Sequence, residues 1–112
     1  MVQEQGVVPN PLTEQELRKL VIDAINATTY ADTLETYHAL YGHVDRGIET
    51  GDVIHGLESV WQFERQPQFN RDTWQWKYYI ATETVDGKPI TIVIAVDSWR
   101  REFVTVTRWR EN

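Results

Sequence analysis

The hydrophobic periodicity of the chain changes near Ser59, and this change constrains the fold more than any other feature of the sequence. Before Ser59, apolar residues recur every three or four positions, as they do on one face of a helix. After Ser59, apolar and polar residues alternate with a period of two, as they do in half-buried β-strands. Because helical and strand patterns occupy separate halves of the chain, the sequence predicts an α+β fold with N-terminal helices packed on one sheet.

About three helices are predicted. The first begins at Thr13, which forms a capping-box pattern with Glu16, and the Thr-rich stretch 26–31 is expected to end it. The second begins at Asp32 and is expected to end at Gly47, because glycine readily takes the left-handed conformation found after helices. A short third helix is predicted from Thr50 to Leu57. Residues 1–12 are expected to be a flexible leader, and residues 13–112 a single domain.

A four-stranded antiparallel sheet is predicted from residues 60–65, 74–85, 90–96 and 103–110. Asp86-Gly87 lies between two of these runs and indicates a two-residue hairpin. Pairing Val85 with Lys88 across that turn places Tyr79 opposite Ile94 and Ala81 opposite Ile92. Ile90, Ile92, Ile94 and Val96 then face the helices together with Tyr79, while three aromatic residues lie on the other side: Trp74, Trp76 and Tyr78. These three are either partly exposed, as for a partner, base stacking or a dimer contact, or covered by the N-terminal helix or the loop 66–73.

The composition is that of a globular protein with an uneven charge distribution. The chain has 112 residues, no cysteine and a net charge of −6. Residues 1–58 carry 10 acidic and 3 basic residues, whereas residues 59–112 carry 7 acidic and 8 basic residues. The negative net charge argues mildly against nucleic-acid binding, although the sheet half could still bind phosphate.

No apolar run is long enough to cross a membrane, so we expect a cytoplasmic protein. We also expect no cofactor and no metal site.

His38 and Arg46 are the first candidate functional residues. His38 lies on the apolar stripe of the predicted second helix, and its imidazole could give or take a proton near neutral pH. Arg46 follows eight residues later, where its guanidinium could stabilise a phosphorane-like transition state. Each residue also has a structural interpretation. His38 could be a hydrogen-bonded histidine at the edge of the core, and Arg46 could complement a helix C-terminus.

The last predicted strand alternates hydroxyl, arginine and aromatic side chains. Thr107, Arg108, Trp109 and Arg110 follow one another, and such a strand could hold phosphates and stack bases. Arg108 and Arg110 are therefore candidate nucleic-acid-binding residues. The same pattern also fits an edge strand that charged side chains keep soluble.

Residues 37–110 resemble domain-of-unknown-function family 4258, small bacterial domains related to RelE, barnase and colicin-type ribonucleases. The resemblance is carried by His38-Ala39, Arg46-Gly47-Ile48, Asp52-Val53, the hairpin Asp86–Ile90 and the closing Val104–Thr107. It implies a RelE/barnase-like α+β fold and metal-independent RNA cleavage of the toxin type. In that reaction His38 would act as acid or base, Arg46 as phosphate clamp and Thr107 as a hydrogen-bond donor to phosphate.

Two functions therefore compete. The first is a metal-independent, ribonuclease-like protein that binds RNA through His38, Arg46, Thr107, Arg108 and Arg110. The second is a non-catalytic domain that binds a protein partner or forms a homodimer through exposed aromatic residues of the sheet. The second is favoured by the acidic charge, by the five tryptophans and by Gly42, which stands where members of the family often have a second arginine.

Overall fold

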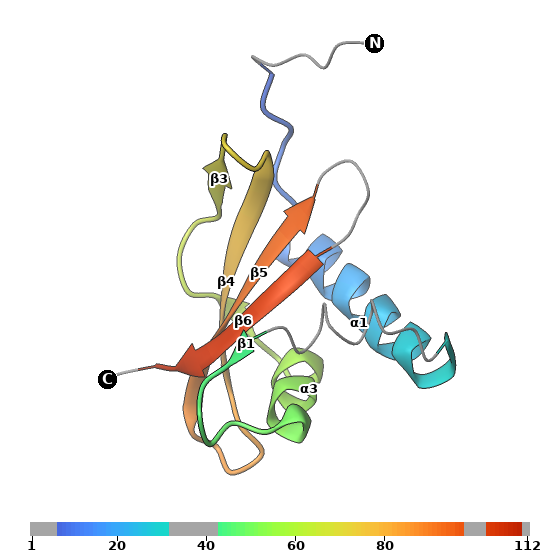
Figure 1. Cartoon of the computed structure of the whole chain (residues 1–112), viewed down its shortest axis with the longest axis vertical. Coiled ribbons are helices and arrows are strands. Elements are labelled where there is room, and N and C mark those ends of the chain that lie inside the picture. The colour runs from blue at the N-terminus through green and yellow to red at the C-terminus, as the bar shows by residue number, and fades with distance from the viewer. Residues whose placement is uncertain (1–6, 32–42, 98–102, 111–112) are drawn as a thin grey trace.

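The structure is a computed structural model that describes residues 7–31, 43–97 and 103–110. Its described part contains two helices, α1 (Glu14–Ala31) and α3 (Thr50–Glu58), and a six-stranded sheet (Figure 1). The strands are β1 (His43–Val44), β2 (Gln62–Phe63), β3 (Gln68–Asn70), β4 (Gln75–Glu83), β5 (Pro89–Asp97) and β6 (Phe103–Trp109). The predicted α+β class is confirmed, and the described residues contain two helices and six strands, where about three helices and four strands were predicted.

The sheet is mostly antiparallel, in the order β1-β6-β5-β4-β2, and β3 also pairs with β4. The exception is the short β1, which runs parallel to β6 with Val44 opposite Thr107. Neither β1 nor β3 was predicted, because strands of two and three residues carry no measurable periodicity. The parallel pair joins the middle of the chain to its C-terminal strand.

Helix α1 begins as predicted. The backbone N–H of Thr13 donates to Glu16 Oε1 at 2.9 Å, and the backbone N–H of Glu16 donates to Thr13 Oγ1 at 3.1 Å. This reciprocal pair is a capping box and satisfies two N–H groups at the helix start. The prediction that the helix ends at residues 26–31 is wrong, because the helix continues to Ala31. Threonine costs only tenths of a kcal/mol relative to other helical residues, so it does not by itself stop a packed helix.

The predicted second helix falls largely on residues 32–42, which lie outside the described residues. Its predicted C-terminal part is wrong, because His43–Val44 form β1 and Arg46-Gly47 form a turn. Gly47 does have a positive φ of 92°, as expected of a glycine that reverses the chain direction. It serves a turn between β1 and α3 rather than a helix end.

Helix α3 matches its predicted range within one residue. Val53 and Leu57 are fully buried as predicted, and Ile54 is half-buried. The backbone N–H of Glu49 donates to Asp52 Oδ2 at 3.0 Å and thereby satisfies one of the free donors at the helix start. At the other end, the backbone N–H of Ser59 donates to the carbonyl of His55.

The β4–β5 hairpin forms where it was predicted, but the predicted register is wrong by one residue. The backbone N–H of Thr84 donates to the carbonyl of Lys88 at 2.8 Å, so the loop has three residues rather than two. Gly87 has a positive φ of 83°, as in a three-residue hairpin loop with a glycine bulge. Tyr79 consequently lies opposite Val93, and Ile94 lies opposite Tyr78.

A shift of one residue turns every side chain of a strand to the other face. Tyr78 therefore faces the helices and is 1% exposed, whereas the predicted register placed it on the far side. Trp76 lies on the same face, half-buried, and its indole Nε1 donates to the carbonyl of Pro9 at 2.9 Å. Trp74 is also half-buried and contacts Phe69 edge-on. These residues are thus not the exposed aromatic surface that the sequence suggested.

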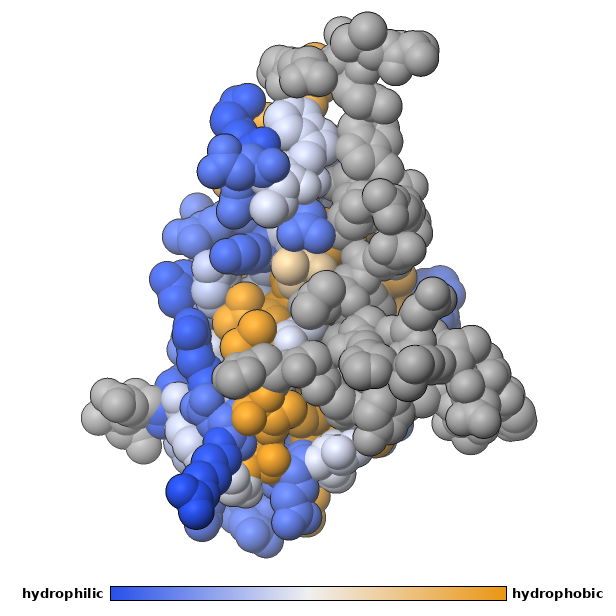
Figure 2. Space-filling model, viewed as in Figure 1, coloured by the Kyte–Doolittle hydropathy of each residue, from blue (hydrophilic) through white to orange (hydrophobic). Residues whose placement is uncertain are grey.

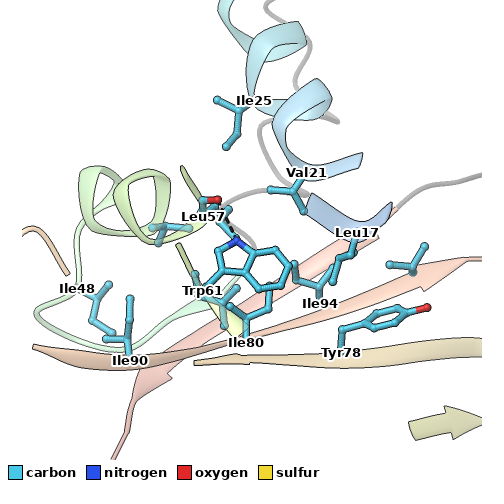
Figure 3. Packing of buried hydrophobic residues seen from close by; sticks show 13 residues of the cluster. Leu17, Val21, Ile25, Ile48, Leu57, Trp61, Tyr78, Ile80, Ile90 and Ile94 are labelled. Atoms are coloured by element: carbon cyan, nitrogen blue, oxygen red, sulfur yellow. Dashed lines mark hydrogen bonds between the residues drawn. The ribbon is translucent and has the colours of Figure 1, made fainter. Parts of the chain in front are cut away.

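The hydrophobic core lies between the sheet and the two described helices, which cover the same face (Figure 3). Trp61 lies near its centre, and its indole Nε1 donates to the carbonyl of Leu57 at 3.1 Å (Figure 3). Burial of such a large apolar cluster is the main stabilising term for a domain of this size. The core comprises Leu17, Val21, Ile25, Ile48, Val53, Leu57, Trp61, Tyr78, Ile80, Ile90, Ile92, Ile94 and Val96.

The segment Val7 to Leu12, part of the predicted leader, contacts the sheet through two hydrogen bonds. One is the bond from Trp76 to Pro9, and the other runs from the backbone N–H of Leu12 to the Tyr78 hydroxyl at 2.8 Å. Burial raises the pKa of Tyr78, and the bond from Leu12 partly offsets that rise. Among the described residues, no helix is long and apolar enough to cross a membrane.

Candidate functional site

The parallel pairing of β1 with β6 brings two distant parts of the chain together. His43 lies opposite Val106 and Val44 opposite Thr107, so the turn after β1 lies beside the end of β6. Arg46 is in that turn, and Thr107 is in that strand. Two of the residues singled out from the sequence, separated by about 60 positions, therefore belong to one region of the molecule.

The turn from Asp45 to Ile48 is attached to β6 by its backbone. The N–H of Asp45 donates to the carbonyl of Thr107 at 2.9 Å, and the N–H of Ile48 donates to the carbonyl of Asp45 at 3.1 Å. Ile48 is 7% exposed and packs into the core, which anchors the end of the turn. The turn therefore has a defined position relative to the sheet.

Trp109 makes three contacts with this turn. Its backbone N–H donates to Asp45 Oδ2 at 3.2 Å, and its indole Nε1 donates to the carbonyl of Arg46 at 3.1 Å. Its ring also lies against Gly47, where an added Cβ would be 3.6 Å from Trp109 Cζ2. In spite of these contacts, the side chain is 37% exposed. We call Asp45, Arg46, Gly47 and Trp109 the β1–β6 junction.

The arginines of this region differ in the face they occupy. Arg46 is exposed in the junction itself. Arg108 lies opposite Thr91, on the sheet face away from the helices, and Arg110 follows two positions later on the same face. Trp109, between them, lies on the helix-covered face. Among the described residues, none of the three guanidinium groups forms an ion pair, since the ion pair found there joins Lys19 to Asp23.

Thr107 is fully buried on the helix-covered face, where it lies opposite Ile92. Within the described part of the chain, its hydroxyl Oγ1 has no hydrogen-bond partner. A buried polar group without a partner costs about 1–3 kcal/mol. A buried hydroxyl of this kind calls for an explanation other than packing, such as a role in binding or catalysis.

His38 lies outside the described residues, so its position relative to Arg46 and Thr107 stays a prediction. Sequence analysis missed the contribution of Asp45, and it named Trp109 only as the aromatic side chain of a strand that could stack bases. Asp45 carries no sequence signal, because its contact with Trp109 spans 64 positions and depends on a two-residue strand. Among residues 7–31, 43–97 and 103–110, no group of three potential metal ligands occurs.

The sheet face away from α1 and α3, which we call the open face, is partly covered by the β2–β3 connection. The guanidinium of Arg65 lies 4.0 Å from the centre of the Tyr79 ring, and the Tyr79 hydroxyl donates to Gln68 Oε1 at 3.0 Å. Thr91 Oγ1 donates to Glu64 Oε2 at 3.2 Å.

The middle of the open face has three half-buried apolar residues, Val93, Ala95 and Val106. The half-buried Lys77 lies opposite Ala95 on the same face, and the exposed Arg108 follows Val106 on that face of β6. In Figure 2, hydrophobic residues are visible in the middle of the molecule beside a border of hydrophilic residues. A surface of this kind, apolar in its centre and polar at its border, is typical of protein contacts.

Comparisons of this chain with known proteins found no match. No protein-family model, no curated protein and no solved structure matches the chain. The residues of this chain, and their geometry, therefore carry the functional inference.

Proposed function

We propose that this protein is a metal-independent, ribonuclease-like protein whose site lies at the β1–β6 junction. The observation that carries the proposal is the attachment of the turn containing Arg46 to the strand containing Thr107, through the 2.9 Å bond from Asp45 to Thr107. Two residues that the family resemblance assigns to one site are thereby brought to one region. The guanidinium of Arg46 is exposed and forms no ion pair with the residues that the structure describes, which supports the same proposal, because such a group can bind a phosphodiester.

The proposed reaction is an internal transesterification of RNA. A base removes the proton from a ribose 2′-hydroxyl, and the 2′-oxygen forms a bond to phosphorus while the bond from phosphorus to the 5′-oxygen breaks. An acid gives a proton to the departing 5′-oxygen, so the products are a 2′,3′-cyclic phosphate and a new 5′-hydroxyl. His38 is proposed as one of these two proton-transfer groups, since imidazole titrates near neutral pH.

Arg46 is proposed to bind the phosphate and to stabilise the additional negative charge that develops on its oxygens. Thr107 is proposed to donate a hydrogen bond to the phosphate. Its hydroxyl is fully buried, so this role requires the groups that cover it to move aside when RNA binds. Arg108 and Arg110 lie on the open face and are proposed to bind phosphates farther along the strand.

Cleavage of a mixed-sequence RNA in EDTA tests this proposal. Wild type is compared with His38→Ala and Arg46→Ala, and with Lys19→Ala as a control. Lys19 lies in α1, and its side chain is 79% exposed. We expect cleavage by wild type and by Lys19→Ala, with cyclic phosphate ends, and a loss of roughly 100-fold or more in the His38 variant.

Circular dichroism and urea titration of each variant establish that the fold is intact. If the His38 and Arg46 variants cleave as fast as wild type, the assignment of these residues is wrong. If folded wild type cleaves neither free RNA nor RNA on ribosomes, the ribonuclease-like proposal is wrong.

A second function, a protein-interaction domain, is favoured by the half-buried apolar centre of the open face. Light scattering measures whether the protein is a dimer, and Val106→Lys tests whether this face is the contact. Val60→Lys is the matched control, because Val60 is 98% exposed and lies outside the sheet. A dimer that dissociates in Val106→Lys alone would support this function, and a monomeric wild type at all concentrations would exclude self-association.

A further inference from the structure

Trp109 differs from the other exposed large apolar residues of the described chain. Those residues are Val7, Val60 and Val85, whereas Trp109 exposes 37% of a much larger aromatic side chain. A tryptophan ring buries a large apolar area when it binds a ligand, and it loses little conformational freedom. Its exposed part therefore gives the β1–β6 junction an aromatic surface that a ligand can cover.

The ring of Trp109 has a fixed orientation. Its backbone is bonded to Asp45, its indole N–H to the carbonyl of Arg46, and its edge lies against Gly47. A side chain held at both ends has already lost the rotational freedom that binding would otherwise remove. Such preorganisation strengthens binding without any additional contact.

The same contacts determine which interaction the exposed part of the ring can make. The single hydrogen-bond donor of the indole is already used by Arg46. The accessible surface is therefore carbon and π-electron density, which binds flat apolar groups by stacking. A ligand that depends on a hydrogen bond to Trp109 would have to break the bond to Arg46.

The charge around Trp109 favours a ligand that is both flat and anionic. The exposed Arg46 belongs to the turn whose carbonyl the indole contacts, whereas Arg108 precedes Trp109 in β6 and lies on the opposite face of the strand. The nearest acidic group identified by a contact is Asp45, whose Oδ2 accepts the backbone N–H of Trp109. A nucleotide combines a flat base with a negative phosphate and so matches both features.

We propose that Trp109 is a stacking platform for one base of a single-stranded RNA, beside the phosphate bound by Arg46. This inference rests on the proposed function, because it assumes that the junction receives RNA. Trp109 is a base-binding residue in this proposal, since it touches the substrate base rather than the reacting atoms. Every base has a π-face, so the platform tolerates all four bases, and purines bind more tightly through their larger area.

The test measures binding rather than cleavage, so that it separates this inference from the proposed catalysis. The probe is a labelled 2′-O-methyl oligoribonucleotide, which cannot be cleaved because it has no free 2′-hydroxyl. Its dissociation constant is measured by fluorescence anisotropy for wild type, Trp109→Leu and Trp109→Phe. We expect roughly 5- to 100-fold weaker binding by Trp109→Leu and a smaller loss by Trp109→Phe, which keeps an aromatic ring.

Two controls make the result specific to stacking. Val85→Ala changes another exposed apolar residue and should leave the dissociation constant unchanged. An abasic oligonucleotide of the same length and charge should bind wild type and Trp109→Leu equally, because it offers phosphates without bases. The fluorescence of Trp109 itself is the difference in indole emission between wild type and Trp109→Phe. This fluorescence should be quenched when the 2′-O-methyl probe binds.

The inference is wrong if wild type and folded Trp109→Leu bind the 2′-O-methyl probe equally, or if wild type does not bind it. It is also wrong if Trp109→Leu loses self-association while its probe binding is unchanged, since Trp109 would then belong to a protein interface. Probe binding that depends on Trp109, combined with no RNA cleavage by wild type, would support the platform and reject catalysis.

Discussion

The carboxylate of Asp52 joins the start of α3 to the β4–β5 hairpin, because its Oδ1 accepts the backbone N–H of Val85 at 3.1 Å. Its other oxygen accepts the N–H of Glu49 at 3.0 Å. One side chain thus satisfies two backbone donors that lie 36 positions apart in the chain. Helix α3 and the hairpin are thereby held in one arrangement.

We predict that Asp52→Asn lowers the free energy of unfolding by about 1 kcal/mol at neutral pH, because an amide offers one acceptor oxygen where two are used. The bonds from Glu49 and Val85 lower the pKa of Asp52 below its usual 3.8. The stabilisation is therefore complete above pH 3.8 and is lost as pH falls through the lower folded-state pKa.

Urea titrations of wild type and Asp52→Asn at several pH values measure this difference. Asp23→Asn is a matched control, because its ion pair with Lys19 is exposed and should contribute little. If wild type exceeds Asp52→Asn in free energy of unfolding by the same amount at neutral and at strongly acidic pH, the carboxylate charge is not involved.

Gly56→Ala should destabilise the protein by about 1–3 kcal/mol through overpacking of α3 against β4. A Cβ at Gly56 would lie 2.8 Å from Thr82 Cγ2 and 3.3 Å from the carbonyl oxygen of Glu83. The same substitution at Gly51 in the same helix meets nothing within 4 Å and should be neutral or stabilising by up to about 1 kcal/mol. Thermal unfolding of both variants gives the comparison, and equal effects would contradict the tight packing at Gly56.

Gly47→Ala should cost about 1–2 kcal/mol, because its φ of 92° is unfavourable for a residue with a Cβ. The contact with Trp109 would be an ordinary one at 3.6 Å, so the cost comes from the backbone conformation. Gly47→Asn should recover part of the loss, since asparagine tolerates the left-handed region better. Urea unfolding measures the free energy of unfolding of both variants. If Gly47→Ala is as stable as wild type, the turn can take another conformation.

Thr107→Val should stabilise the protein by about 1 kcal/mol, because it removes a buried hydroxyl without a described partner. Thr82→Val is the opposite case, because the Thr82 hydroxyl donates to the carbonyl of Gly56 at 2.8 Å, and it should be destabilising by about 1 kcal/mol. Denaturation of Thr107→Val and Thr82→Val measures the change in the free energy of unfolding for each variant.

Under the proposed function, Thr107→Val also loses RNA cleavage while it gains stability, which is a trade-off typical of functional residues. A destabilised Thr107→Val would show that the hydroxyl has a partner in the folded protein. Retained cleavage by a folded Thr107→Val would remove Thr107 from the proposed site.

Local signals predicted the features that depend on a few neighbouring residues. The capping box of Thr13 and Glu16, the range of α3 and the position of the β4–β5 hairpin all follow from interactions within about four positions along the chain. The positive φ of Gly47 was also expected, although its turn was assigned to the end of a helix. These features depend on backbone conformations that neighbouring residues determine largely by themselves.

Tertiary structure decided the features that depend on distant contacts. The register that turns Tyr78 toward the helices differs by one residue from the simplest hairpin, and the packing of Tyr78 and Ile80 in the helix-covered core, in place of Tyr79 and Ala81, stabilises it. The pairing of Val44 with Thr107, and with it the contact of Trp109 with Arg46, spans more than 60 positions. The free energy of such pairings depends on packing throughout the domain. The sequence therefore indicated Arg46 and Thr107 as candidates, but it indicated neither the contribution of Asp45 nor the arrangement of these residues.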